Sequence, residues 1–248
     1  MSRENRKIKR TRIAGLPLIR EIEKKMNLRS ILSQYIESNG NEIIPIADTL
    51  MLMIYNITLG RQPLYELSAW VNNLDVSIHG LHDYELLSLN DDRFARALDS
   101  LYKADRASLL TSIVVDMIKN FSIDLSRIHN DSTTVKACGK INGVTSTGFH
   151  LANGKSKDHR PDLKQLLFTL SISSDGAVPI HYKTYPGNRT DDTTHIETWN
   201  TLCSIHGAPD FMNVADFKVC TTRQLTHIVG SGGRVITILP ETWKETKV

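Results

Sequence analysis

The sequence predicts an α+β protein with a helical first half and a second half of short strands and helices. Up to about residue 120, apolar residues recur at the three- and four-residue spacing of amphipathic helices. From Leu125 onward the pattern changes to short β-branched or apolar runs separated by turn residues. The 248 residues are 40% hydrophobic and 23% charged, as in ordinary globular proteins of one or two domains. We therefore expect a basic disordered arm (1–13), a helical domain (14–122) and an α/β domain (123–248).

The first half carries start and stop signals for several helices. Asn39-Gly40-Asn41 is a stop signal, and the apolar segment 46–57 predicts the most buried helix. Pro63 can open a further helix, and Asn90 with the two aspartates that follow it can cap another. A last amphipathic helix is expected over 107–118. Together these segments predict a helical bundle.

The second half predicts three strands, a helix, a strand, a helix and a strand, in that order. The strands are expected at 128–136, 166–172, 178–185, 211–215 and 235–239, and the helices at 193–205 and 222–229. Gly176 after Asp175 marks a tight turn that joins the second and third strands into a hairpin. This order matches a partial ribonuclease-H-like fold, which places acidic residues on its first and fourth strands. Here those acids are Asp131 and Asp216.

The two aspartates are the candidate catalytic and metal-binding residues. Carboxylates on neighbouring strands can hold Mg²⁺, whereas an isolated Asp-Ser-Thr is more often a turn or a cap. The combination of Asp131 and Asp216 with a basic stretch between them favours metal-dependent phosphodiester chemistry. His129 and His159 are interpreted as packing or hydrogen-bonding residues, because Mg²⁺ prefers oxygen. Four candidate contacts to DNA phosphates lie in the basic stretch: Lys155, Lys157, Arg160 and Lys164.

Charge and cysteine usage exclude several classes of protein. Residues 1–12 carry +5 and the rest of the chain −2, so this basic arm either binds phosphates or is a solvated terminus. It is not followed by the apolar core of a secretory signal, and no apolar stretch reaches the length of a membrane span. Three widely spaced cysteines argue against a disulfide framework or a structural zinc site. We expect a cytoplasmic protein with no membrane partner.

Eight blocks of sequence, in order along the chain, resemble a known enzyme family. In the second half they are His-Asn-Asp-Ser-Thr-Thr (129–134), the block 156–165, Tyr-Pro-Gly-Asn-Arg-Thr-Asp (185–191) and Val-Ala-Asp (214–216). In the first half they lie at 16–18, 61–65, 90–93 and 96–99. The second half resembles the catalytic core of bacterial and archaeal DDE insertion-sequence transposases of the large, hairpin-forming group. The first half resembles the helical leader domain of one subgroup.

The resemblance implies DNA cleavage and strand transfer that depend on two Mg²⁺ or Mn²⁺ ions. Asp131 and Asp216 would bind the ions together with a third acid, a glutamate on a late helix within a Tyr-x-x-Arg-x-x-x-Glu pattern. Glu241 and Glu245 lack that pattern, so we expect an amino-terminal fragment with an incomplete two-ion site and no activity by itself. The implied partners are DNA, as transposon terminal inverted repeats and target DNA, and a second copy in a homodimer. The implied location is the prokaryotic nucleoid.

Two alternatives to a transposase remain open from the sequence. One is a non-catalytic DNA-binding product that occupies transposon ends or inhibits full-length partners. The other is a decayed gene product with no selected function, or a chain that folds poorly because its sheet lacks the closing helices. An uncovered strand at 235–239 would then favour aggregation.

Overall fold

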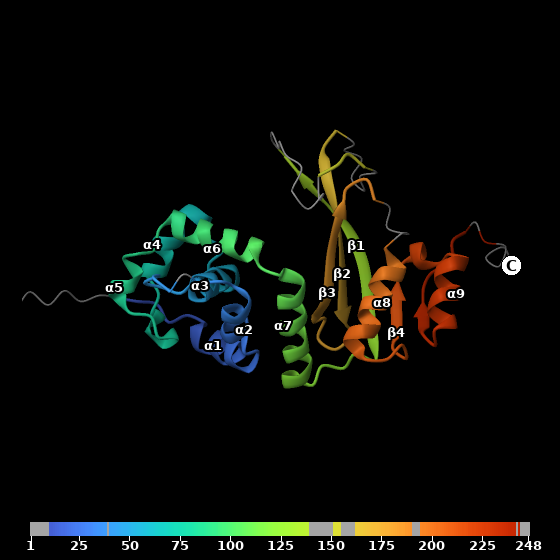
Figure 1. The fold of residues 1–248 in the computed structure, drawn as a ribbon, viewed down its shortest axis with the longest axis horizontal. Helices are drawn as coiled ribbons and strands as arrows, with labels where there is room; N and C mark the ends of the chain where they lie inside the picture. Colours follow the sequence, from blue (N-terminus) through green and yellow to red (C-terminus); the bar gives the residue numbers. More distant parts are fainter. Residues whose placement is uncertain are drawn as a thin grey trace, which may run out of the picture. The chain divides into compact units, whose positions relative to one another are not determined.

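The computed structural model describes residues 10–38, 40–138, 151–154, 162–189, 194–241 and 243. These residues form two compact units, one up to Phe121 and one from Ser122 onward. The first unit is helical and the second is built on a five-stranded sheet (Figure 1). The α+β class expected from the sequence is confirmed. Within the described part of the chain, no helix combines the length and apolarity needed to cross a membrane.

The first unit contains helices joined by short loops and 3-10 turns. The helices are α1 (Leu16–Lys25), α2 (Leu28–Tyr35), α3 (Ile46–Leu59), α4 (Leu67–Asn72), α5 (Asp83–Leu86), α6 (Asp91–Lys103) and α7 (Arg106–Phe121), with 3-10 turns η1 (Leu64–Glu66) and η2 (Val76–His79). Asn90 caps α6 as expected, because its side chain accepts a hydrogen bond from the Arg93 amide at 2.9 Å. Pro63 precedes a 3-10 turn first, and α4 begins only at Leu67.

Helix α3 lies at the centre of the first unit, as the apolar segment 46–57 predicts. It packs against α2, α4 and α6. Leu52 and Tyr55 of α3 and Phe94 of α6 are each 0% exposed. Full burial of one such side chain stabilises the fold by about 1.5–3 kcal/mol, so the packing of α3 against α6 contributes strongly to the stability of the first unit.

A polar network is buried beside this apolar core. The Tyr55 hydroxyl donates to Glu23 Oε2 at 2.6 Å and lies 2.7 Å from His79 Nδ1. Arg29 Nε lies 3.2 Å from Glu23 Oε1, and Arg29 Nη1 lies 2.9 Å from Asp48 Oδ1. Buried polar groups of this kind are tolerated only when they are paired, so the network fixes how α1, α2, α3 and η2 meet.

The second unit has a sheet with strand order β3-β2-β1-β4-β5. Its elements are β1 (Arg127–Ala137), β2 (Lys164–Ser173), β3 (Pro179–Pro186), α8 (His195–His206), β4 (Met212–Ala215), η4 (Phe217–Val219), α9 (Thr222–Gly230) and β5 (Arg234–Ile236). β1, β2 and β3 pair antiparallel, whereas β4 runs parallel to β1 and β5 parallel to β4. This order and these directions are ribonuclease-H-like, as expected.

The hairpin predicted at Gly176 is present, but the last strand is shorter than predicted. Gly176 has a φ of +72°, which glycine adopts readily, and Ser173 N donates to Val178 O at 2.9 Å to close the turn. β5 ends at Ile236, and its three residues pair with Met212, Asn213 and Val214 of β4. The next residue, Thr237, donates its hydroxyl to Asp216 O at 2.7 Å instead.

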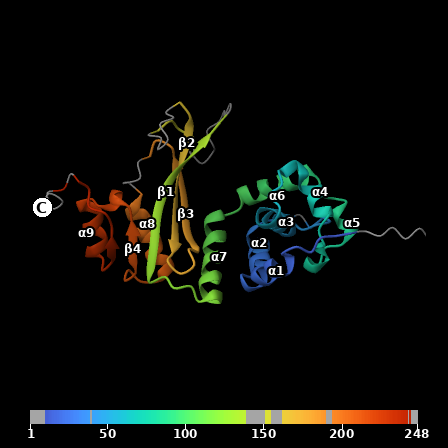
Figure 2. The same ribbon diagram turned by 180° about the vertical axis from the view of Figure 1, so that it is seen from behind.

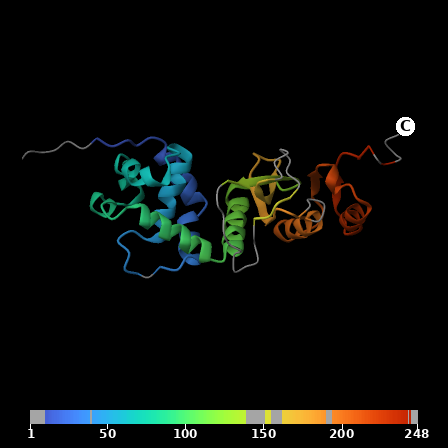
Figure 3. The ribbon, with the colours of Figure 1, turned by 90° about the horizontal axis from the view of Figure 1, so that it is seen from above.

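Helices α8 and α9 lie together on one face of the sheet (Figures 1 and 3). The rings of Trp199 in α8 and His227 in α9 meet edge to face at 5.5 Å. Asn130 of β1 faces α8, with its side-chain nitrogen 3.5 Å from His195 Nδ1. Figure 2, seen from behind, shows β1 in front of α8. The residues directly before and after Asn130 on β1 therefore point to the opposite face of the sheet, away from α8.

Backbone segments cross closely where β2 begins and β3 ends. Gln165 N and O bond to Ala152 O and N at 3.0 and 3.1 Å, and the Gln165 side chain donates to Gly187 O at 3.0 Å. A Cβ on Gly187 would lie 2.1 Å from Gln165 O, and one on Gly154 would lie 1.9 Å from Gly187 O. Only glycine fits at these two positions, which gives a structural role to the Pro-Gly-Asn turn.

We predict that Gly187→Ala destabilises the second unit by about 1–3 kcal/mol or more, because a methyl group there must displace backbone atoms. Gly230→Ala is the matched control, since no atom lies within 4 Å of its added Cβ. Urea unfolding of the two variants measures the difference. Equal urea midpoints for Gly187→Ala and Gly230→Ala would contradict the close approach of the Gly187 backbone to Gln165.

Candidate functional site

The pairing of β1 with β4 determines where the two candidate acids lie. The parallel register runs from Arg127 opposite Met212 to Asn130 opposite Ala215. One further step in this register places Asp131 opposite Asp216. Asp216 still has extended backbone angles, φ −66° and ψ 177°, before the 3-10 turn η4 begins. Neighbouring strands are about 4.8 Å apart, so the two aspartates lie side by side where β4 ends.

Both acids point to the same face of the sheet, away from α8. Buried Asn130 and Ala215 pair on the helix-covered face, and Asp131 and Asp216 follow them by one residue each. Side chains alternate between faces along a strand, so both carboxylates lie on the opposite face. Asp131 is exposed and Asp216 is partly exposed, which leaves both within reach of solvent.

Each carboxylate makes one local hydrogen bond through its Oδ1 atom. Asp131 Oδ1 accepts from the Ser132 amide at 2.7 Å, and Asp216 Oδ1 accepts from the Lys218 amide at 3.1 Å. Neither bond involves an Oδ2 atom. Hard carboxylate oxygens close together are the ligands that Mg²⁺ and Mn²⁺ prefer, so this donor set fits such an ion.

The described residues supply a pair of acids here rather than a larger cluster. Those residues contain no group of three or more His, Cys, Asp and Glu side chains able to hold a metal. His129 shares the face of Asp131, two residues away on β1, but does not complete such a group. His159 lies outside the described residues.

Of the four basic candidates, the structure describes Lys164 alone; Lys155, Lys157 and Arg160 lie outside the described residues. Lys164 is exposed at the start of β2, where it pairs with Ala137. Leu170 of β2 lies opposite Asp131, so Lys164 is six residues away along the strand, or about 20 Å. Positions 164 and 170 on β2 differ by six, an even number, so Lys164 lies on the same face of the sheet as Leu170 and its partner Asp131.

A second group of charges lies on the helix-covered side of the sheet, around Glu197 of α8. Lys183 Nζ donates to Glu197 Oε1, and the Tyr185 hydroxyl donates to Oε2 at 3.1 Å. Arg189 Nη2 lies 3.6 Å from Glu197 Oε2, and its guanidinium stacks 4.5 Å from the centre of the Tyr185 ring. This cluster ties the end of β3 and the loop after it to α8.

Burial and the charges in this cluster shift the pKa values of its titratable side chains. Burial by itself would raise the pKa of Glu197, but hydrogen bonding and charge from Lys183, Tyr185 and Arg189 outweigh burial and lower that pKa. Burial and the neighbouring Glu197 charge raise the pKa of Tyr185 to about 12. Burial, with the charge of Lys183, lowers the pKa of His181. Glu197 is thus ionised and Tyr185 protonated at neutral pH.

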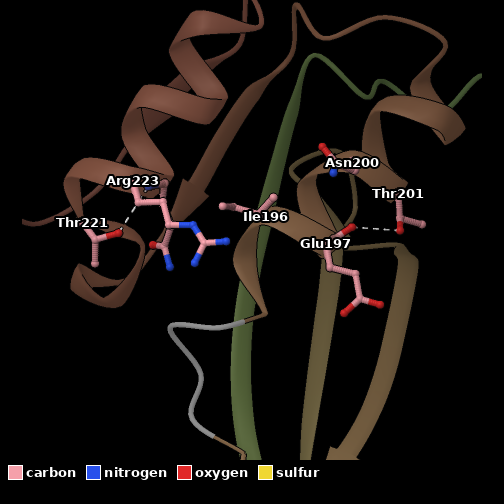
Figure 4. A pocket seen from close by; sticks show the side chains of 7 residues that line it. Ile196, Glu197, Asn200, Thr201, Thr221 and Arg223 are labelled. Carbon is pink, nitrogen blue, oxygen red and sulfur yellow. Dashed lines mark hydrogen bonds between the residues drawn. The ribbon is translucent and has the colours of Figure 1, made fainter.

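A pocket of about 610 Å³ lies between α8 and the start of α9 (Figure 4). It is lined by Ile196, Glu197, Asn200 and Thr201 of α8 and by Thr221, Arg223 and Gln224 at the start of α9. Thr221 caps α9 by accepting a hydrogen bond from the Gln224 amide at 3.3 Å. The pocket lies on the helix-covered side, whereas Asp131 and Asp216 face the other side of the sheet.

Glu197 and Lys183 belong to a charged cluster that the sequence pattern did not single out. One signal was available for Lys183: it lies two residues before Tyr185 on the predicted strand 178–185 and so shares the face of a buried side chain. A lysine on such a face needs a carboxylate partner. The identity of that partner depended on how α8 folds back on the sheet, and the sequence pattern does not specify that.

Comparisons with known proteins reveal distant likenesses. A family model described as a domain of unknown function, DUF4277, matches residues 8–115. No curated protein matches the chain. Among solved structures, a piggyBac transposase synaptic complex with hairpin DNA is similar at 11% identity over 98% of this chain, with a TM-score of 0.46. A Mos1 transposase paired-end complex with the left transposon end is similar at 10% identity over 83%, with a TM-score of 0.32. The chain spans 54% and 62% of the lengths of these two proteins.

We predict that Glu197→Gln destabilises the second unit at pH 7 by about 1 kcal/mol or less, because the carboxylate is partly exposed and solvent screens it. The lowered pKa of Glu197 means that its contribution is present above the usual value of 4.5 and is lost as the pH falls through the folded value. Thermal melts from pH 7 to pH 3 should therefore show the gap between wild type and variant closing.

Glu21→Gln is the control, since the pair of Glu21 with Lys24 is largely exposed on both sides. A gap for Glu197→Gln that stays constant with pH would show that its charge does not stabilise the fold.

Proposed function

We propose that the second unit is part of the metal-dependent catalytic core of an insertion-sequence DNA transposase. The observation that supports this most strongly is the β1–β4 register, which brings Asp131 and Asp216 together on one face of a ribonuclease-H-like sheet. The sequence blocks that contain both acids resemble those of the DDE family. Topology and sequence therefore support the same pair of residues.

In this proposal Asp131 and Asp216 hold the metal ions. Bound there, the ions would supply Lewis-acid chemistry for phosphodiester cleavage. The protein's part is to keep two carboxylates adjacent although their charges repel, and the strand pairing does this. That repulsion would favour the binding of a cation by Asp131 and Asp216.

DNA would lie along the face of the sheet that carries the acids. Lys164 shares that face about 20 Å from Asp131, far enough to contact a separate phosphate of the same duplex. Lys155, Lys157 and Arg160 belong to the same basic stretch of sequence. Contacts of this kind position DNA without reading its sequence. The partners in this proposal are the terminal inverted repeats, target DNA and a second copy of the chain.

A non-catalytic role in DNA binding is the second candidate. The observation that favours it is that the described residues bring together two acids and no larger metal-binding group. In this version the chain occupies transposon ends or inhibits active partners, and its DNA binding needs no metal.

We predict that Mn²⁺ binds the protein at the aspartate pair. Titration followed by electron paramagnetic resonance should show at least tenfold weaker binding in Asp131→Asn and in Asp216→Asn, because each change removes a charged ligand. Asp210→Asn is the matched control, since exposed Asp210 lies just before β4, at the opposite end from Asp216. Mn²⁺ binding that is identical in all three variants would refute the proposed metal site.

We predict in addition that this chain does not nick supercoiled plasmid DNA by itself in Mg²⁺ or Mn²⁺. Two carboxylates provide few ligands and repel each other, so the ions would be held too weakly for turnover. An agarose-gel assay over several hours measures the conversion to nicked circles. A metal-dependent product that disappears in Asp131→Asn would show that the pair is sufficient for cleavage.

A further inference from the structure

The first unit contains a hollow of about 570 Å³ where α1 meets α2. It is lined by Arg20, Glu23, Lys24, Asn27, Leu28, Arg29, Ser30 and Ser33. Three of these side chains are cationic and Glu23 is the single carboxylate among them. The volume is within the range of about 300–1,000 Å³ that is usual for ligand pockets.

Arg29 is fixed in orientation by the buried polar network. Its Nε lies 3.2 Å from Glu23 Oε1, and its Nη1 lies 2.9 Å from Asp48 Oδ1 and donates to His79 O at 3.1 Å. None of these contacts involves Nη2. The side chain is 36% exposed and lines the hollow, so a pre-oriented guanidinium edge is presented to it. A guanidinium held in this way loses little entropy when it binds an oxyanion.

Arg20 and Lys24 add two positive charges to the hollow that take no part in the buried network. Arg29 is paired with two carboxylates, Glu23 and Asp48, whereas Arg20 has no carboxylate within ion-pair distance among the described residues. Lys24 pairs with Glu21 at 2.7 Å, with exposed fractions of 56% and 70%. Exposed pairs contribute little, so Lys24 is readily available to an anion. The two cations are four residues apart on α1 and therefore lie on one helix face.

The first turn of α2 favours an anion at the hollow, whereas the last turn of α1 opposes one, since a helix C-terminus carries partial negative charge. Two carbonyls of that last turn are occupied, because Ile22 O accepts from Met26 N at 2.8 Å and Lys24 O accepts from Asn27 N at 3.0 Å. α2 begins after Asn27 without a side-chain cap. Its first amides thus add positive potential beside the three basic side chains.

We propose that this hollow binds a phosphate group of the DNA backbone. The inference rests on the proposed function, since the hollow is a general oxyanion site and DNA is the ligand that the second unit would process. Hydroxyl groups of Ser30 and Ser33 add hydrogen-bond donors beside the cations. The helical unit would thereby fix the position of DNA through its backbone rather than read its sequence.

The test is duplex binding by the full chain in EDTA, measured by fluorescence anisotropy over a range of salt concentrations. Arg20→Ala/Lys24→Ala should bind roughly tenfold more weakly, and the slope of log affinity against log salt should fall by about 0.9, the value for one phosphate contact. Arg96→Ala/Lys103→Ala on α6 removes the same charge from the same unit and should keep most of the affinity. Equal losses in the two double variants would overturn the inference.

A second measurement does not depend on how the variants fold. Lys24 of the wild type should be protected by bound duplex from acetylation, as read by mass spectrometry, whereas Lys103 should stay reactive. Equal reactivity of Lys24 with and without DNA would overturn the inference. Inorganic phosphate that raises the melting temperature, together with duplex affinity unchanged in Arg20→Ala/Lys24→Ala, would identify a free-phosphate site and overturn the DNA assignment.

These results separate the inference from the proposed function. Because EDTA removes metal, duplex binding in this assay reports on Arg20 and Lys24 without a contribution from the proposed metal site. Duplex binding that depends on Arg20 and Lys24, together with Mn²⁺ binding that ignores Asp131 and Asp216, would refute the metal site alone. A wild type that binds no duplex would overturn both.

Discussion

The parallel pairing of β1 with β4 is the contact on which the second unit depends. It joins segments about 85 residues apart in the sequence, and its register decides which side chains meet. A shift of one residue would turn one aspartate toward α8 and leave the other on the open face. Buried pairs such as Ile128 with Asn213 resist that shift, because they would move to the exposed face. The packing of α8 on the sheet therefore also fixes the position of the acids.

Carboxylates perform a different task elsewhere in the molecule, where they orient cations. Glu23 and Asp48 hold Arg29 in the first unit, and Glu197 holds Lys183 and Arg189 in the second. Glu23 and Asp48 are buried, whereas Glu197 is partly exposed. Fixed cations can bind phosphate oxygens with little loss of entropy. The pair of Asp131 and Asp216 is instead the site that we propose for metal ions.

The sequence predicted the elements well because their signals are local. The Asn90 cap, the Gly176 turn and the apolar period of α3 each depend on residues a few positions apart. The placement of Asp131 beside Asp216 required one global assumption, the strand order, and the structure has that order. The roles assigned to the two acids remain a proposal.

What the sequence did not predict depends on contacts between distant segments. The network around Tyr55 joins α1, α3 and η2, and no periodic pattern indicates that Glu23 is buried. The apolar run 235–239 does not show where β5 ends, because Thr237 bonds to Asp216 O rather than continuing the pairing with β4. The hollow beside Arg29 requires α1 and α2 to meet at a particular angle, which the sequence of neither helix specifies.

Anomalous diffraction from crystals of the protein grown with Mn²⁺ would show whether the two aspartates share a metal ion. We expect a manganese peak within coordination distance of carboxylate oxygens from both Asp131 and Asp216, on the face of the sheet opposite α8. Carboxylates that point to opposite faces, or manganese bound elsewhere while this pair stays free, would contradict this expectation.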